Sequence, residues 1–330
     1  MRSRSRNGVP AALAVCTLGM SLPMLVPASG LAQDFPAKPV RMVVGFTPGT
    51  TVDILGRLLA QRLGERWGQQ VVVENIPGAS STIAAAAVAR APGDGHTMMF
   101  ASTGVIISQS MYMKLPYDVT RDFAPVTLVA LVPNVLVVHP VLPVRNVRDL
   151  IKLAASRPGA LSYSHSGKGS ASHLNTELFK AMANVDIAEI PYKSSTQALT
   201  DVMSGDVLLN YPSLAAVLPH VRSGRVKALA VSGAKRSAAL PDVPAMAEFL
   251  PGYEASGWYG VLVPASTPAP LVSRLHKEIA SVLAVPEVGE KMSAQGAEVM
   301  GSTPEAFARF MREGRDKWDT LIRKLNIPLL

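Results

Sequence analysis

Residues 40–63 read VRMVVGFTPGTTVDILGRLLAQRL, and this stretch decides the fold class. Val40–Val44 is a short β-branched run that predicts a buried strand, and a turn rich in Gly, Thr and Pro follows it. Beyond the turn, apolar residues recur at the spacing of one helix face: Ile54, Leu55, Leu58, Leu59 and Leu63. A strand, a polar turn and an amphipathic helix in this order are typical of α/β proteins with largely parallel sheets.

The same unit recurs along the chain. Further strands are predicted at 70–74, 96–101, 126–132, 135–138, 161–164, 186–191, 207–211, 226–231 and 260–263. Helices are predicted near 83–91, around Leu174–Met182, up to Met203, and at 270–283, 288–295 and 304–325. At 330 residues two lobes are favoured over one long sheet. We therefore expect each lobe to be a mainly parallel sheet flanked by helices.

Buried strands enter and leave the middle of the chain at two places, near 135–139 and 257–263. These crossings place the first lobe at 34–134 and 255–330, and the second lobe at 135–254. Residues 124–144 are apolar enough to suggest a membrane span, but they contain four prolines. A lipid-exposed helix tolerates prolines badly, so two buried strands are the better interpretation.

The N-terminus has the pattern of a secretory signal peptide over residues 1–32. Arg2, Arg4 and Arg6 precede an apolar run, and small residues up to Ala32 suit cleavage there. A retained membrane anchor is the alternative, but prolines at three positions interrupt the run. Cleavage removes the single cysteine, Cys16, so the mature chain holds no disulfide and no thiolate site.

Charge points to small anions rather than to nucleic acid. The formal charge of +8 falls to +5 in the mature chain, with 29 basic and 24 acidic residues. A modest positive field favours anionic small molecules, and the basic residues form no cluster that suggests nucleic acid.

Four loops that follow predicted strands are rich in Gly, Ser and Thr: 45–53, 75–82, 102–104 and 166–173. Ligands of open parallel sheets bind beyond the carboxyl ends of strands, where helix N-termini offer free N–H groups. These loops therefore predict a site for a carboxylate or a phosphate. The alternative is that they only cap helices, since caps prefer the same residue types.

Other chemistries lack their signatures. Gly167-Lys-Gly-Ser170 does not have the spacing of a phosphate-binding loop, and no cofactor is expected. Ser170, His173 and Asp53 could be imagined as a hydrolytic triad, but their spacing does not require one. The six histidines are scattered without a metal-ligand spacing, so neither a catalytic nor a metal residue is expected. Tyr192 and Trp258 are the aromatic candidates for contact with a ligand. A place in the core is an equally good interpretation of Trp258.

The chain resembles a known family. The residues that carry the resemblance are 35–44, Thr47-Pro-Gly with Asp53, 71–79, 115–118, 122–126, 135–138, 170–173, 177–180, 191–193, 228–231, 240–244, 257–260 and 317–318. Together they are similar to the substrate receptors of tripartite tricarboxylate transporters, also called Bug-type periplasmic binding proteins. The resemblance covers essentially all of 34–330.

The resemblance implies a two-lobed flytrap fold that closes on a small carboxylate in the periplasm, with no enzymatic activity. It implies a monomer that delivers its ligand to the membrane permease subunits of a tripartite transporter. Carried over by position, the contacts of the first lobe are Phe46, Thr47, Pro48, Gly49, Thr50, Thr51, Asp53, Ala79, Ser80, Ser81, Ser102 and Thr103. Those of the second lobe are Ser166, Gly167, Ser170, His173 and Tyr192.

Four positions depart from the family pattern: Thr50, Ser80 and Ser81 stand where glycine is common, and so does Ser194 after Tyr192-Lys. Hydroxyls there narrow the pocket or add donors, so the carboxylate class is better supported than a named tricarboxylate. Two other functions remain open from the sequence. One is a periplasmic sensor that passes the same ligand to a signalling partner, and the other is an exported serine hydrolase.

Overall fold

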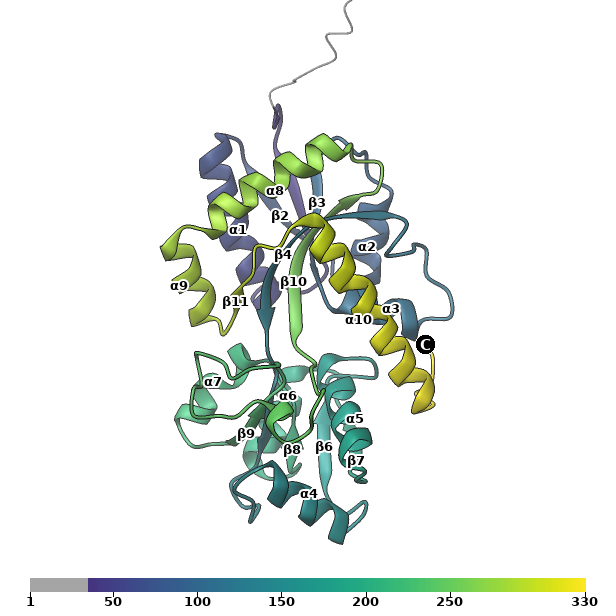
Figure 1. The fold of residues 1–330 in the computed structure, drawn as a ribbon, viewed down its shortest axis with the longest axis vertical. Coiled ribbons are helices and arrows are strands. Elements are labelled where there is room, and N and C mark those ends of the chain that lie inside the picture. The colour runs from purple at the N-terminus through teal and green to yellow at the C-terminus, as the bar shows by residue number, and fades with distance from the viewer. Residues whose placement is uncertain (1–34) are drawn as a thin grey trace, which may run out of the picture. The chain divides into compact units, whose positions relative to one another are not determined.

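The computed structural model describes residues 35–330 (Figure 1). The predicted signal peptide and its cleavage site lie outside the described residues. Among the described residues, no helix combines the length and the apolar character needed to cross a membrane.

Two mixed sheets organise the chain. The strands are β1 (Val40–Val44), β2 (Val71–Asn75), β3 (Thr97–Ser102), β4 (Phe123–Val132), β5 (Val135–Val138), β6 (Ser162–His165), β7 (Ala188–Pro191), β8 (Leu209–Asn210), β9 (Lys227–Val231), β10 (Gly257–Pro264) and β11 (Glu298–Val299). The first sheet has the order β11-β4-β10-β3-β1-β2, and the second has the order β7-β6-β8-β5-β9. The α/β class and the two-sheet architecture are confirmed.

The helices surround both sheets (Figure 1). They are α1 (Thr51–Trp67), α2 (Thr82–Ala89), α3 (Gly104–Met111), α4 (Val147–Ser156), α5 (Ala171–Ala183), α6 (Ser195–Ser204), α7 (Leu214–Arg222), α8 (Ala269–Leu283), α9 (Pro286–Ala294) and α10 (Pro304–Lys324), with 3-10 turns η1 (Ala79–Ser81) and η2 (Met246–Glu248). Helices α3, α4 and α7 have no counterpart among the predicted elements.

Both faces of the first sheet are buried. Successive side chains of a strand point to opposite faces, so Val40, Met42 and Val44 pack with α1 and α8, while Val43 packs with α2, α3 and α10. The second sheet is covered in the same way, by α4 and α5 on one face and by α6 and α7 on the other. Ile54, predicted to face the core, is 39% exposed at the edge of the α1 face.

The strands that carry the polar loops run parallel, as expected: β1 pairs parallel with β2 and β3, and β6 with β7 and β8. The expectation of mainly parallel sheets is too simple, because β4, β5 and β10 pair antiparallel with their neighbours. These three strands are where the chain passes between the sheets, and a chain that leaves one sheet and later returns reverses its direction. The residues at 124–144 form β4 and β5, as predicted.

Two connecting segments join the sheets and bond to one another. Asn134, between β4 and β5, donates its N–H to Ser232 Oγ and accepts the Ser232 N–H, both at 2.8 Å. Ala255 in turn donates to the Ser232 carbonyl at 2.9 Å. Gly257, at the start of β10, pairs with Val132 at the end of β4.

Candidate functional site

Three polar loops meet beyond the carboxyl ends of β1, β2 and β3. A methyl group on Gly45 would lie 1.8 Å from Ser81 Oγ, so the first two loops touch directly. One on Gly104 would lie 3.1 Å from the Ser80 carbonyl and 3.5 Å from Ser102 Oγ, so the third loop adjoins the second. The predicted residues at 46–53, 79–81 and 102–103 therefore form one group, which we call the first donor cluster.

Asp53 anchors this cluster from the first turn of α1. It is 2% exposed, and its carboxylate accepts the Gly49 N–H at 2.9 Å and the Asn75 Nδ2–H at 2.8 Å. Arg57 pairs with the same carboxylate at 2.9 Å. Burial alone would raise the pKa of Asp53, but the hydrogen bonds from Arg57, Gly49 and Asn75 lower it below its ordinary value. Asp53 therefore has its oxygens occupied by the protein and fixes the loop instead of presenting a free acceptor.

The second loop has a left-handed backbone at three successive non-glycine residues. The φ angles of Ala79, Ser80 and Ser81 are 45°, 54° and 77°, after Gly78 at 134°. Residues other than Gly, Asn and Asp adopt this region rarely, because the Cβ of an L-residue crowds the following carbonyl. Such strain collects at ligand-binding sites, where the surrounding structure holds it in place.

Thr103 and Trp258 join the third loop to β10. Thr103 Oγ1 accepts the Trp258 N–H at 2.8 Å, and both residues are buried. The Trp258 ring packs edge-on against Phe307 at 5.3 Å, with 2% of the residue exposed. Trp258 is therefore a core residue, and its N–H group fixes the third loop through Thr103.

A second donor cluster, which we define as residues 166–173 with Tyr192, follows β6 and β7. Ser170 is the N-cap of α5, and its Oγ accepts the His173 N–H at 3.3 Å. Ser172 Oγ lies 3.2 Å from Ser170 Oγ and accepts the Ser166 N–H at 3.3 Å. The N–H groups of Ala171 and Ser172 open the helix, so they have no acceptor within it and are free to face an anion.

Tyr192 lies at the end of β7, and its N–H donates to the His165 carbonyl at 2.9 Å. Its hydroxyl donates to Asp201 Oδ2 at 2.6 Å, and that bond raises the pKa of Tyr192 to about 12. The ring is half-buried against an apolar group of side chains that includes Leu199 and Val202 of α6, and its hydroxyl is already paired.

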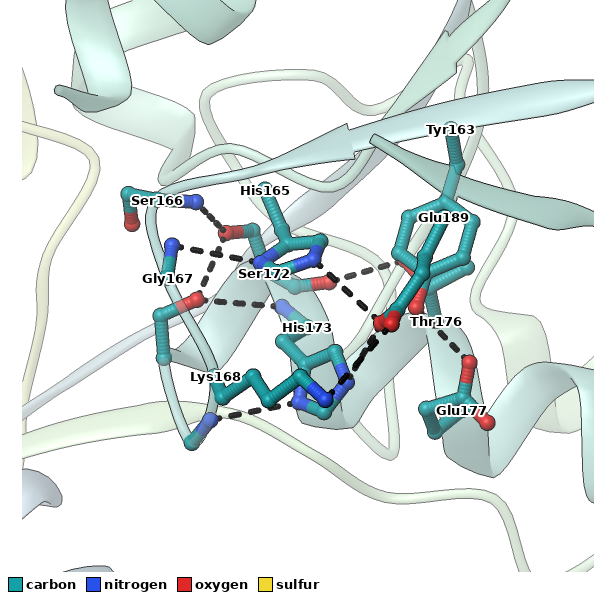
Figure 2. A network of polar contacts seen from close by, with 12 residues as sticks. Tyr163, His165, Ser166, Gly167, Lys168, Ser172, His173, Thr176, Glu177 and Glu189 are labelled. Atoms are coloured by element: carbon teal, nitrogen blue, oxygen red, sulfur yellow. Dashed lines mark hydrogen bonds and ion pairs between the residues drawn. The ribbon is translucent and has the colours of Figure 1, made fainter. Parts of the chain in front are cut away.

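Two buried histidines, His165 and His173, lie beside the loop of the second cluster (Figure 2). His165 ends β6, His173 lies in the first turn of α5, and their rings are 4.6 Å apart. Nε2 of His165 lies 3.5 Å from Glu189 Oε2, and Nε2 of His173 lies 3.4 Å from the same oxygen. Burial lowers the pKa of both, that of His173 to about 4, so both rings are neutral near pH 7.

The arrangement does not form a hydrolytic triad. Nδ1 of His173 accepts the Gly169 N–H at 3.2 Å, and Nε2 faces Glu189, so neither ring nitrogen faces Ser170 Oγ. Asp53 belongs to the other cluster and is bonded to Arg57 and Asn75.

The chain matches the family described as "Tripartite tricarboxylate transporter family receptor" over residues 55–327. The chain belongs to this family. Its members are substrate-binding receptors and not enzymes, which rules out the exported hydrolase.

Individual relatives agree with the family match. Protein BugT of Bordetella pertussis is 35% identical over 318 residues, covering 96% of each chain. The solved structure "R. palustris Rpa4515 with adipate" is 39% identical with a TM-score of 0.81, covering 90% of this chain and all of its own. Periplasmic binding protein BugD is 33% identical with a TM-score of 0.78 and the same coverage. The predicted resemblance to Bug-type receptors is confirmed.

Four residues of this region went unnoticed in the sequence: Arg57, Asn75, His165 and Glu189. Arg57 could have been found, because it lies four residues after Asp53 on one helix face. Asn75 ends a strand inside one of the motifs that carry the resemblance. His165 and Glu189 gave no signal, because the pairing of β6 with β7 alone brings them together.

Proposed function

We propose that the chain is an exported receptor that binds a small carboxylate between two lobes. The first lobe comprises 34–134 and 255–330, and the second comprises 135–254. The ligand carboxylate contacts Ser, Thr and backbone N–H groups of both donor clusters, and the lobes close by bending at the bonded segments near Asn134 and Ser232. This proposal rests on the family match together with two Gly/Ser/Thr-rich clusters beyond parallel strands.

Neutral donors hold the ligand in this account. Two cationic side chains at the clusters already face carboxylates of the protein: Arg57 pairs with Asp53, and Lys168 Nζ lies 3.8 Å from Glu189. Hydrogen bonds to a charged group contribute about 1.5–3 kcal/mol each, so three or four of them suffice for micromolar binding after association costs. A bare carboxylate lies nearer Ser102 and Ser170 than Asp53, which would repel it.

The relatives favour a dicarboxylate as the first ligand to try, because one similar solved structure, 39% identical, is described with adipate and another, 29% identical, with bound malate. We further propose that the mature protein acts in the periplasm as a monomer after cleavage near Ala32. It then delivers its ligand to the permease subunits of a tripartite transporter.

A thermal-shift screen of the mature protein tests the proposal. The probes are mono-, di-, tri- and aromatic carboxylates, with glucose and inorganic phosphate as controls. A ligand at about 100 times its dissociation constant stabilises the protein by about 2.7 kcal/mol, which a melting curve detects. Stabilisation by at least one carboxylate class and not by the controls is expected. Stabilisation by phosphate or glucose alone would refute carboxylate binding.

A further inference from the structure

Glu189 lies on β7 and is not among the predicted contact residues, yet the buried rings of His165 and His173 both lie against it (Figure 2). We infer that Glu189 is a positioning residue: through His165 and His173 it fixes the backbone of the ligand loop at Gly167 and Gly169. The consequence for affinity rests on the proposed function, whereas the effect on the loop does not.

Backbone donors determine the tautomer of each imidazole. The Gly167 N–H donates to His165 Nδ1, and the Gly169 N–H donates to His173 Nδ1, both at 3.2 Å. A nitrogen that accepts a hydrogen bond carries no proton, so the proton of each neutral ring is on Nε2. Both Nε2 atoms lie near one atom, Oε2 of Glu189, at 3.5 Å from His165 and 3.4 Å from His173, so the contact is electrostatic, and His165 Nε2 has no other polar partner among the described residues. The carboxylate thereby stabilises the tautomer that leaves Nδ1 free to accept from the loop.

The burial of the histidines makes this acceptor important. His165 is 0% exposed and His173 is 3% exposed, so water cannot replace Glu189 at their Nε2 atoms without a rearrangement. A buried donor without an acceptor is destabilising, and a shift of the proton to Nδ1 is the simplest relief. An Nδ1–H would then oppose the Gly167 or Gly169 N–H, and the loop would lose that anchor. Both glycines have positive φ, 105° and 75°, so their backbone conformation depends on such local bonds.

The anchor also divides the donors of the loop between structure and ligand. Gly167 and Gly169 donate to the histidines, and Ser170 N donates to the Gly167 carbonyl at 3.1 Å. What remains for a ligand is the helix start at Ala171 and Ser172 with the Ser166 and Ser170 hydroxyls. Glu189 therefore acts on affinity through the position of these groups and not by touching the ligand.

The same three side chains are of types that bind Zn²⁺, but the tautomer opposes a metal site. A metal needs the lone pair of Nε2, and here Nε2 carries the proton because Nδ1 accepts from the backbone. Metal-bound histidines usually donate their other N–H to an acceptor, which is the reverse of the bonds to Gly167 and Gly169. Lys168, with Nζ 3.8 Å from Glu189, adds a repelling charge.

The test compares Glu189→Ala with Glu189→Gln in the mature protein without ligand. Both histidines face a single oxygen, so the one amide oxygen of Gln can replace it, whereas Ala removes it. Asp186→Ala, which removes an exposed carboxylate just before β7, is the matched control. Proton–nitrogen NMR should place the proton of both rings on Nε2 in the wild type, in Glu189→Gln and in Asp186→Ala. In Glu189→Ala we expect mixed tautomers and amide exchange at Gly167 and Gly169 faster by roughly tenfold, the effect of one lost hydrogen bond.

Three results would overturn the inference: an Nδ1–H tautomer in the wild type, unchanged glycine exchange in Glu189→Ala, or stabilisation of the wild type by Zn²⁺ that Glu189→Ala abolishes. A ligand arm then uses the carboxylate that stabilises the wild type most, with adipate as the first probe. Affinity should fall several-fold in Glu189→Ala and be largely kept in Glu189→Gln. If no carboxylate binds the wild type, the proposed function fails while the NMR result still decides the role of Glu189.

Discussion

At the scale of single residues, Ser80 has a conformation that its side chain disfavours, with φ 54° and ψ 39°. The left-handed region costs an L-residue about 1–2 kcal/mol, and replacing Ser80 by glycine removes this cost. Part of that gain is offset, because glycine has more conformational freedom in the unfolded chain. Ser80→Gly should therefore stabilise the protein by about 0.5–1 kcal/mol in urea unfolding. Ser281→Gly, in the right-handed helix α8, is the control and should destabilise by a similar amount. A destabilised Ser80→Gly variant would mean that the hydroxyl, and not the strain, dominates at this position.

Asp53 was predicted as a ligand contact from the resemblance, with a helix-capping role as the alternative. In the structure its carboxylate accepts from three donors, on Gly49, Arg57 and Asn75. Asn at this position would place its NH2 group against at least one of these donors, so Asp53→Asn should lose about 1–3 kcal/mol of unfolding free energy. It should weaken all carboxylate ligands alike and leave their ranking unchanged. Asp319→Asn breaks an exposed Asp–Arg pair in α10 and should cost less than about 0.5 kcal/mol. A changed ligand ranking in calorimetry would instead restore Asp53 as a direct contact.

The two buried histidines predict a pH dependence of stability. Burial lowers the folded pKa of both histidines, and the neighbouring His165 lowers that of His173 further, to about 4. Glu189, Glu177, Lys168 and the buried Tyr163 are the other titratable groups that face them. Between about pH 6.5 and 4 the unfolded chain binds more protons than the folded one, so stability falls as the pH falls through this window. At about 1.4 kcal/mol per pKa unit, the fall of the His173 pKa from 6.5 to about 4 corresponds to a loss of roughly 3–4 kcal/mol.

Urea unfolding at several pH values measures this loss. The double variant His165→Asn and His173→Asn keeps a side-chain oxygen near the place of each Nδ1 but does not titrate. Its stability should be nearly flat between pH 6.5 and 5, where the wild type already declines. Equal slopes for the two proteins would assign the pH dependence to other groups.

At the scale of elements, the sequence predicts the strands better than the helices. Val40–Val44 and Val135–Val138 are short runs rich in valine. They form β1 and β5 with the predicted bounds. Helix α3 was missed because its apolar run at 104–111 is too short to distinguish a helix from a strand. Helix α4 did carry a signal, since Asn146 caps it by accepting the Asp149 N–H.

The candidate site was predictable only in part, for the same reason. Loop composition marks where free donors lie, because Gly, Ser and Thr leave N–H and hydroxyl groups available. It does not reveal which of those groups the protein itself uses. The Asp53 carboxylate accepts from Asn75, 22 residues away, and the histidines that accept from Gly167 and Gly169 lie beside Glu189 on another strand. Such pairings follow from strand register, which a single sequence does not encode locally.

The contact between the first two loops gives a prediction at this scale. A Cβ on Gly45 would lie 1.8 Å from Ser81 Oγ and 2.5 Å from its Cβ, so Gly45→Ala must displace η1. We expect a loss of about 1–3 kcal/mol and weaker ligand binding, because overpacking moves the backbone. Adding Ser81→Gly removes the two closest atoms and should recover part of both losses. Gly289→Ala, in helix α9 with open space around it, should be neutral or stabilising. No recovery in the double variant would place the conflict elsewhere.

At the scale of the whole molecule, the chain crosses between two sheets with buried faces at segments that bond to one another, and each sheet presents one donor cluster beyond its parallel strands. Rigid sheets keep the donors of each cluster in fixed positions, and the proposed closure bends the chain at the joining segments near Asn134 and Ser232. This division suits a receptor that must hold its ligand and later release it. The central claim is that donors of both clusters, and not a salt bridge, hold the carboxylate.

Titration calorimetry with the most stabilising carboxylate tests that claim most directly, using wild type, Ser102→Ala, Ser170→Ala and Lys168→Ala. Each serine variant should weaken binding by roughly tenfold, or about 1.4 kcal/mol, since each removes one donor to a charged group. Lys168→Ala should change affinity by less than about threefold, because Lys168 faces Glu189 and is 40% exposed. Loss of binding in Lys168→Ala with both serine variants unaffected would contradict the account.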